Sequence, residues 1–226
     1  MPAYSTAIFD LDGTLLDSLE DLHLSTNVAL AEHGLPARSL EEVRRFVGNG
    51  IRKLVERAVP AGTGAAEQEA VYEDFCAHYA AHCEDNTGPY PGILELLARL
   101  RAAGVRLAVV SNKGDFAVQE LVARQFPGAF DAILGENEAA GIRKKPAPDM
   151  VEAALARMGA DRDGMVYIGD SEVDVQTAAS VGCPCISCTW GFRSVDDLLA
   201  AGATTFVNTP AELERVLLGR PGQTAR

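Results

Sequence analysis

The chain has 226 residues, of which 47% are hydrophobic and 23% are charged, and its formal net charge at pH 7 is −12. This composition is typical of a globular protein, and the length allows one large domain or a core domain with a smaller insertion. The acidic balance, without a run of lysine and arginine, argues against a nucleic-acid partner, and no apolar stretch is long enough to span a membrane.

The cysteines and the N-terminal residues indicate a cytoplasmic protein. The N-terminus lacks the basic region and apolar stretch of a signal peptide. The cysteine count is odd, its members being Cys76, Cys83, Cys183, Cys185 and Cys188. We therefore expect free thiols in a reducing compartment.

The first predicted element is a buried strand at residues 6–9, which runs directly into a polar segment that begins at Asp10. Further short apolar runs follow at wide intervals, and helical patterns lie between the later ones; these runs are residues 105–110, 132–134, 165–168 and 184–187. Apolar strands that alternate with helices predict a parallel sheet covered on both faces. The expected fold class is therefore α/β, with a doubly wound, Rossmann-like core.

The segment after the first strand does not follow this alternation. It contains no convincing strand, and Ser18 and Ser39 each stand three positions before an acidic residue, which is typical of a helix start. We expect an all-helical cap domain at residues 17–86, inserted into a core formed by residues 1–16 and 87–226. Residues 88–92 are the predicted return hinge, because they combine glycine and proline.

Polar side chains follow the predicted strands at the positions where ligands bind in an open parallel sheet, beyond the carboxyl ends. Asp10 and Asp12 follow the first strand, and Asp170 and Asp174 follow the fourth. Several carboxylates at one edge would repel each other, and a hard divalent cation relieves that repulsion. The pattern predicts a Mg²⁺ site with Asp10 and Asp170 as ligands and Asp174 as a direct ligand or a supporting residue.

These residues also suggest a division of chemical roles. One carboxylate can attack phosphorus, and a second carboxyl two residues later can donate a proton to the leaving group and then activate water. Gly13 leaves room for phosphate beside the backbone. Ser111 can hydrogen-bond phosphoryl oxygens, and Lys145, placed before Pro146, can offset their charge.

Four segments of the chain resemble the motifs of the haloacid dehalogenase superfamily, over nearly its whole length. They are Asp10-Leu11-Asp12-Gly13-Thr14, Ser111-Asn112-Lys113, Lys145-Pro146-Ala147-Pro148, and Gly169-Asp170-Ser171 with Asp174. The resemblance implies Asp10 as nucleophile and Asp12 as acid/base. It also implies Mg²⁺ bound by Asp10, the main-chain carbonyl of Asp12 and Asp170.

Within that superfamily the sequence is most similar to phosphoglycolate phosphatases. Residues 46–50 resemble their cap loop, and residues 90–92 resemble their entry into the core. The expected activity is Mg²⁺-dependent hydrolysis of a small phosphomonoester, foremost 2-phosphoglycolate, through an aspartyl-phosphate intermediate. The predicted substrate contacts are Gly13, Thr14, Ser111 and Asn112 in the core, and Gly48, Asn49, Gly50 and Arg52 in the cap.

Several alternatives stay open at this point. Asp12 argues against a dehalogenase, which needs no proton donor, and Gly169 before Asp170 argues against sugar-phosphate mutases, which usually carry glutamate there. Pyrophosphate, other short phosphoesters and nucleoside monophosphates remain candidate substrates. A phosphotransferase of the sugar-phosphate mutase type and a non-catalytic binding protein on the same fold are further alternatives. We expect a monomer or a homodimer that acts on a small phosphorylated metabolite.

Overall fold

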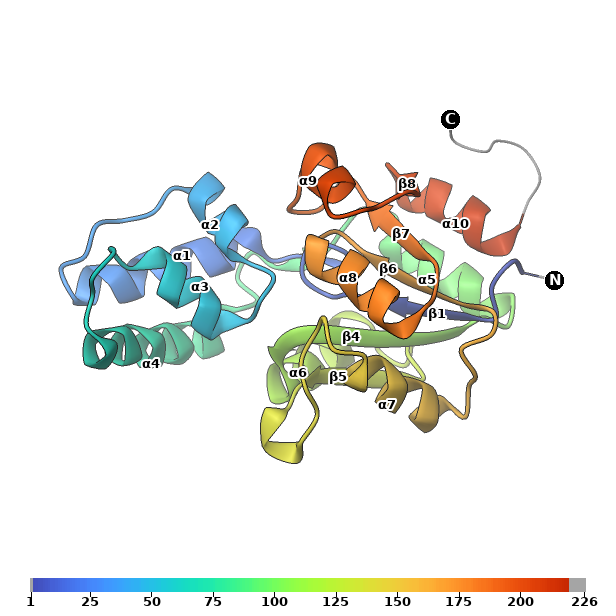
Figure 1. The fold of residues 1–226 in the computed structure, drawn as a ribbon, viewed down its shortest axis with the longest axis horizontal. Coiled ribbons are helices and arrows are strands. Elements are labelled where there is room, and N and C mark those ends of the chain that lie inside the picture. Colours follow the sequence, from blue (N-terminus) through green and yellow to red (C-terminus); the bar gives the residue numbers. More distant parts are fainter. Residues whose placement is uncertain (1, 220–226) are drawn as a thin grey trace. The chain divides into compact units, whose positions relative to one another are not determined.

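The computed structural model describes residues 2–219, so the extreme ends of the predicted core, residues 1 and 220–226, lie outside the described residues. The chain divides into two compact units (Figure 1). One unit consists of Met1–Leu15 with Pro89–Arg226, and the other of Leu16–Gly88. None of the helices within residues 2–219 has both the length and the apolar character needed to cross a membrane.

The larger unit contains a six-stranded sheet whose neighbouring strands are all parallel, in the order β5-β4-β1-β6-β7-β8. The strands are β1 (Thr6–Phe9), β4 (Arg106–Gly114), β5 (Ala132–Glu136), β6 (Met165–Gly169), β7 (Cys185–Cys188) and β8 (Phe206–Val207). The predicted α/β class and parallel sheet are confirmed. The edge strand β8 is not among the predicted strands.

Helices connect the strands and cover the sheet. They are α5 (Ile93–Ala102), α6 (Asp115–Gln125), the short 3₁₀ helix η1 (Glu138–Ala140), α7 (Asp149–Met158), α8 (Glu172–Val181), α9 (Val195–Ala200) and α10 (Pro210–Leu218). Apolar residues of α7 and α8 pack with Ile8 of the central strand in one core cluster. Successive strand residues point to opposite faces, and Ala7 and Phe9 are as fully buried as Ile8. Both faces of the sheet are therefore covered, as the continuous apolar strand at residues 6–9 requires.

The register of the central strands brings their carboxyl ends to one edge. Phe9 pairs with Val109 of β4 and with Ile168 of β6. The N–H of Asp10 donates to the carbonyl of Ile168 at 2.9 Å, which extends the ladder by one residue. The polar residues that follow these three strands therefore start from the same level of the sheet.

The smaller unit is mainly helical. Its elements are α1 (Leu19–Glu32), α2 (Leu40–Phe46), α3 (Ile51–Ala58) and α4 (Ala65–His82), and the short strands β2 (Leu16–Asp17) and β3 (Gly88–Pro89) pair with each other. α1 packs along α4, where the rings of Phe75 and Tyr79 stack with centroids 5.4 Å apart. Ser39 caps α2 by accepting from the N–H of Glu42, as its place before an acidic residue predicts.

Asp21 lies three residues after Ser18, which suggests that the two residues cap the start of α1, but the structure shows a different role for Asp21. Ser18 precedes α1 but makes no side-chain capping bond, and the Asp21 carboxylate instead accepts hydrogen bonds from the N–H and side chain of both Asn86 and Thr87. Burial raises the pKa of Asp21, but the hydrogen bonds from Thr87 and Asn86 together lower it by a larger amount. The pKa of Asp21 therefore lies below its usual value. The carboxylate therefore ties the start of α1 to the end of this unit.

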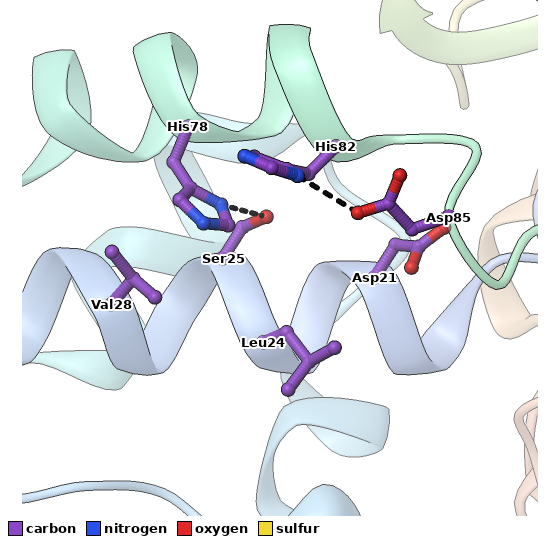
Figure 2. A pocket seen from close by; sticks show the side chains of 7 residues that line it. All are labelled: Asp21, Leu24, Ser25, Val28, His78, His82 and Asp85. Carbon is purple, nitrogen blue, oxygen red and sulfur yellow. Dashed lines mark hydrogen bonds and ion pairs between the residues drawn. The ribbon is translucent and has the colours of Figure 1, made fainter.

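A hollow lined by both polar and apolar side chains lies between α1 and α4 of the same unit, as Figure 2 shows. The imidazoles of His78 and His82 stack with centroids 4.3 Å apart. Nδ1 of His78 lies 3.0 Å from the hydroxyl of Ser25, and Nδ1 of His82 lies 2.8 Å from the carboxylate of Asp85 (Figure 2). Each ring is thus oriented by its own partner, and the cluster joins the two helices.

Candidate active site

Three buried aspartates meet at the carboxyl edge of the sheet. Asp10 follows β1, Asp170 follows β6, and Asp174 lies in the first turn of α8. One carboxylate oxygen from each lies within 4.8 Å of the others, and all three side chains are buried. The predicted convergence of these residues is therefore present, and the group is able to hold a metal ion.

Glycines permit this close packing of carboxylates. Gly13 has φ +86°, and a Cβ atom there would lie 2.4 Å from Oδ2 of Asp170. A Cβ atom on Gly169 would lie 2.2 Å from Cγ of Asp174. Both distances are far shorter than a van der Waals contact, so any larger residue would displace an aspartate of the cluster. The Asp170 carboxylate thus occupies the position that a side chain at residue 13 would take.

Asp170 is held by a donor on each oxygen. The hydroxyl of Thr14 donates to Oδ1 at 2.9 Å, and the N–H of Phe192 donates to Oδ2 at 2.8 Å. Thr14 is in turn fixed by the indole N–H of Trp190, which donates to its carbonyl at 3.0 Å. Thr14 was predicted to contact substrate, whereas the segment from Trp190 to Phe192 was not predicted to take part in the site. The sequence feature that could have indicated this segment is Gly191, which follows β7 at the same edge of the sheet.

Lys145 lies between two of the aspartates. Its Nζ is 2.9 Å from Oδ1 of Asp10 and 2.8 Å from Oδ1 of Asp174, and its side chain is only 2% exposed. By contrast, the exposed Lys144 reaches Glu138, at 3.9 Å. The structure therefore selects Lys145, the lysine beside Pro146, as the cation of the cluster.

Asn112 fixes the backbone of Lys145. Its side-chain N–H donates to the carbonyl of Lys145 at 3.1 Å, and its side-chain oxygen accepts from the N–H of Lys145 at 2.8 Å. This residue was predicted to contact substrate, and in the structure its amide joins the end of β4 to the loop that carries the lysine. The Lys145–Pro146 peptide bond is cis.

Asp174 has partners on both oxygens. Lys145 occupies Oδ1, and the N–H and hydroxyl of Ser171 donate to Oδ2 at 3.1 and 2.6 Å. Ser171 immediately precedes α8, so these bonds also satisfy the start of the helix. The carboxylate of Asp174 is therefore oriented by the helix start and directed at the lysine.

Burial and mutual repulsion disfavour the ionised form of the cluster. Burial, followed by the charge of Asp174, raises the pKa of Asp170 to about 7. The same two causes raise the pKa of Asp10 well above its usual value, although Lys145 opposes them. Burial lowers the pKa of Lys145, but Asp10 and Asp174 raise it more, so the lysine stays protonated. Lys145 thus contacts two of the three carboxylates.

Asp12 lies outside the group of three aspartates and has a cation of its own. Nζ of Lys113 lies 3.0 and 3.2 Å from the two carboxylate oxygens of Asp12. Ser111 is buried nearby in the chain, and its hydroxyl accepts from the N–H of Lys113 at 3.2 Å. Lys113 was not given a role from the sequence, since a lysine two residues after a strand serine is by itself uninformative.

The predicted cap-loop residues belong to the helical unit and form a local arrangement there. Gly48 and Gly50 have φ values of +118° and +87°, so the loop needs glycine at both positions. Arg57 donates to the carbonyl of Phe46 at 2.7 Å and to the side-chain oxygen of Asn49 at 2.8 Å. The loop that precedes α3 is therefore clamped by an arginine from that helix.

Arg52, also predicted to contact substrate, is engaged within its own unit. Its guanidinium makes two hydrogen bonds to the carboxylate of Glu69, at 2.6 and 3.0 Å, and lies 3.9 Å from the ring centroid of Tyr72. Such a bidentate, stacked arginine joins α3 to α4.

Comparison with known proteins shows the family of this chain. The family model for haloacid dehalogenase-like hydrolases matches residues 7–188. A phosphoglycolate phosphatase from Caulobacter vibrioides is 36% identical over 192 residues, which is 83% of this chain and 80% of that protein. Another from Cereibacter sphaeroides is 36% identical over 217 residues, 93% of this chain and 98% of that protein.

Solved structures give the same result. A crystal structure from Lactobacillus delbrueckii subsp. bulgaricus, described as a candidate phosphoglycolate phosphatase, is 43% identical with a TM-score of 0.90, covering 97% of this chain and 100% of that chain. CbbY from Rhodobacter sphaeroides, solved in complex with phosphate, is 26% identical with a TM-score of 0.72, covering 93% and 96%. The chain therefore belongs to the haloacid dehalogenase-like hydrolase family. Within that family it is a phosphoric monoester hydrolase.

Proposed function

We propose that the chain hydrolyses 2-phosphoglycolate to glycolate and phosphate, with Mg²⁺ as cofactor and Asp10 as the residue that becomes phosphorylated. The observation that carries this proposal is the buried cluster of Asp10, Asp170 and Asp174 beside Lys145 at the end of β1. The relatives at 36% identity, which are named phosphoglycolate phosphatases, support the choice of substrate. A reducing cytoplasm is the proposed setting, since all five cysteines are free thiols.

The residues of the cluster fit a divalent cation. Lys145 contacts two of the three buried carboxylates, and burial together with the charge of Asp174 raises the pKa values of Asp10 and Asp170. Oxygen ligands of this kind suit Mg²⁺. We assign Asp10, Asp170 and the main-chain carbonyl of Asp12 as its ligands. We assign Asp174, whose Oδ1 lies 2.8 Å from Nζ of Lys145, a supporting role that orients this lysine.

In the first chemical step, the Asp10 carboxylate attacks phosphorus and the bond from phosphorus to the ester oxygen breaks. Asp12 donates its proton to that oxygen, so glycolate leaves as the alcohol rather than the alkoxide. Lys145 and the hydroxyl of Ser111 stabilise the negative charge on the phosphoryl oxygens. When bound, Mg²⁺ would supply further positive charge to the same oxygens.

In the second step, the Asp12 carboxylate takes a proton from a water molecule. The water oxygen bonds to phosphorus, the bond between phosphorus and Asp10 breaks, and phosphate is released. The carboxylate of Asp10 is thereby regenerated, and Asp12 is again protonated for the next cycle.

The helical unit is the proposed source of substrate selectivity. The bond from Arg57 to the side-chain oxygen of Asn49 leaves the amide N–H₂ of Asn49 as the donor that the loop presents. A donor beside the start of α3 suits a carboxylate, because the first main-chain N–H groups of a helix have no partner within the helix. 2-Phosphoglycolate carries such a carboxylate two bonds from its ester oxygen.

A panel of phosphate esters tests the proposed function. We expect kcat/KM to be highest for 2-phosphoglycolate among a set that also contains pyrophosphate, hexose phosphates and nucleoside monophosphates, with phosphate release as the measurement. Chelation of divalent ions should lower the rate by at least about 100-fold, and added Mg²⁺ should restore it. Faster release from pyrophosphate, or transfer of phosphate to a sugar hydroxyl instead of water, would overturn the assignment.

A further inference from the structure

Lys113 is a buried cation that the reaction steps above do not use. Its side chain is 3% exposed, whereas that of its partner Asp12 is 15% exposed. Two contacts, at 3.0 and 3.2 Å, place Nζ against both oxygens of the carboxylate. A buried ammonium group is unfavourable unless it is paired, and the contact with Asp12 provides such a pair.

The backbone of β4 explains how Lys113 reaches Asp12. The pairing of β4 with β5 changes register between Val110 and Gly114, which is an irregularity of the kind that redirects side chains beside active sites. Within this stretch, Asn112 and Lys113 are consecutive residues that contact different partners. Asn112 bonds the backbone of Lys145, and Lys113 meets the carboxylate of Asp12.

Two buried lysines thus divide the acidic residues of the site. Lys145 contacts Asp10 and Asp174, the members of the metal-binding cluster, and Lys113 contacts Asp12, which is outside that cluster. Each lysine therefore contacts different carboxylates of the site.

We propose that Lys113 is a positioning residue, which holds the Asp12 carboxylate in the orientation needed for proton transfer to and from the reacting oxygens. This inference rests on the role proposed for Asp12, and it assigns Lys113 no contact with the substrate. The effect of replacing Lys113 on the rate must therefore depend on whether the reaction step needs a proton from Asp12. A residue that binds substrate, or one that only supports the fold, would lack that dependence.

Two substrates with different leaving groups test this dependence. The value of kcat/KM reports on the steps up to release of the leaving group. p-Nitrophenolate can leave without being protonated, whereas an alkoxide such as that of glycolate needs a proton from Asp12. For Lys113→Met we expect kcat/KM to fall about 100-fold with 2-phosphoglycolate and less than about 3-fold with p-nitrophenyl phosphate. The matched control, Lys144→Met, removes a neighbouring exposed lysine and should change neither value.

A double variant provides the second readout. If Lys113 acts only through Asp12, the variant with both Lys113→Met and Asp12→Asn should be as slow with 2-phosphoglycolate as Asp12→Asn alone. Equal losses for both substrates, or a double variant slower still, would overturn the proposal. Lys113→Gln gives the same test should Lys113→Met fold poorly, because the ratio of the two kcat/KM values does not depend on the folded fraction.

The failure of this inference is distinguishable from failure of the proposed function. The wild-type protein reports on the function itself, since it must hydrolyse 2-phosphoglycolate. If it instead prefers another alkyl phosphate of the panel, that ester replaces 2-phosphoglycolate in the comparison, and the dependence on leaving group is unchanged in form.

Discussion

Replacement of Asp10 by asparagine is expected to abolish hydrolysis while the protein stays folded. An amide lacks the nucleophilic oxygen of a carboxylate, so no phosphorylated intermediate forms, and loss of a nucleophile of this type reduces kcat by at least about 10⁴-fold. The side-chain oxygen of asparagine can still accept from the N–H of Leu11 and from Lys145, as Oδ1 of Asp10 does. Phosphate release with 2-phosphoglycolate, compared with wild type, is the measurement.

The fold of this variant needs its own control. Asp10→Asn removes one buried carboxylate from a crowded group, so its thermal midpoint should be no lower than that of the wild type. Asp163→Asn changes an exposed aspartate between α7 and β6 and should keep full activity. Wild-type rates in Asp10→Asn would refute its assignment as the nucleophile.

The second large effect concerns stability without metal. Because the pKa of Asp170 is raised to about 7, the folded protein binds more protons than the unfolded chain between pH 4 and pH 7. The free energy of unfolding must therefore fall as pH rises through this window. One pKa unit corresponds to about 1.4 kcal/mol, so the contribution lost between pH 5 and pH 7 is about 2–3 kcal/mol. The raised pKa of Asp10 acts in the same direction.

Urea unfolding in the presence of a chelator measures this loss. Asp170→Asn should show a weaker decrease between pH 5 and pH 7 than the wild type, because asparagine does not titrate. Its amide can be accommodated, since the oxygen can accept from the N–H of Phe192 while the N–H₂ group donates to the hydroxyl of Thr14. Saturating Mg²⁺ should stabilise the wild type most at pH 7. An equal pH dependence in both proteins would contradict the assigned electrostatics.

Much of the core could be predicted because its strands are fully buried and continuous in apolar residues. The predicted runs at 105–110, 132–134, 165–168 and 184–187 correspond to β4 to β7, and parallel pairing follows from the helices between them. β8 was missed because two residues are too short to carry a pattern. β4 extends to Gly114 because the polar residues after Val110 stay extended, which apolar periodicity cannot indicate.

The convergence of Asp10, Asp170 and Asp174 could be predicted for a similar reason, since the carboxyl ends of parallel strands meet at one edge. The contacts among the surrounding polar groups could not. That Thr14 bonds Asp170, or that Lys113 bonds Asp12, depends on side-chain directions set by a tight turn and a register shift. Sequence spacing contains no such directional information.

The claim that Asp10 carries the phosphoryl group is tested most directly by mass spectrometry of the peptide that contains this residue. Asp12→Asn, which should form the intermediate from p-nitrophenyl phosphate but hydrolyse it slowly, is mixed with that ester and Mg²⁺, quenched in acid and digested. We expect one added phosphoryl group on the peptide that contains Asp10, and none when Asp10→Asn is also present. A phosphoryl group on any other residue, or its persistence in that double variant, would contradict the mechanism.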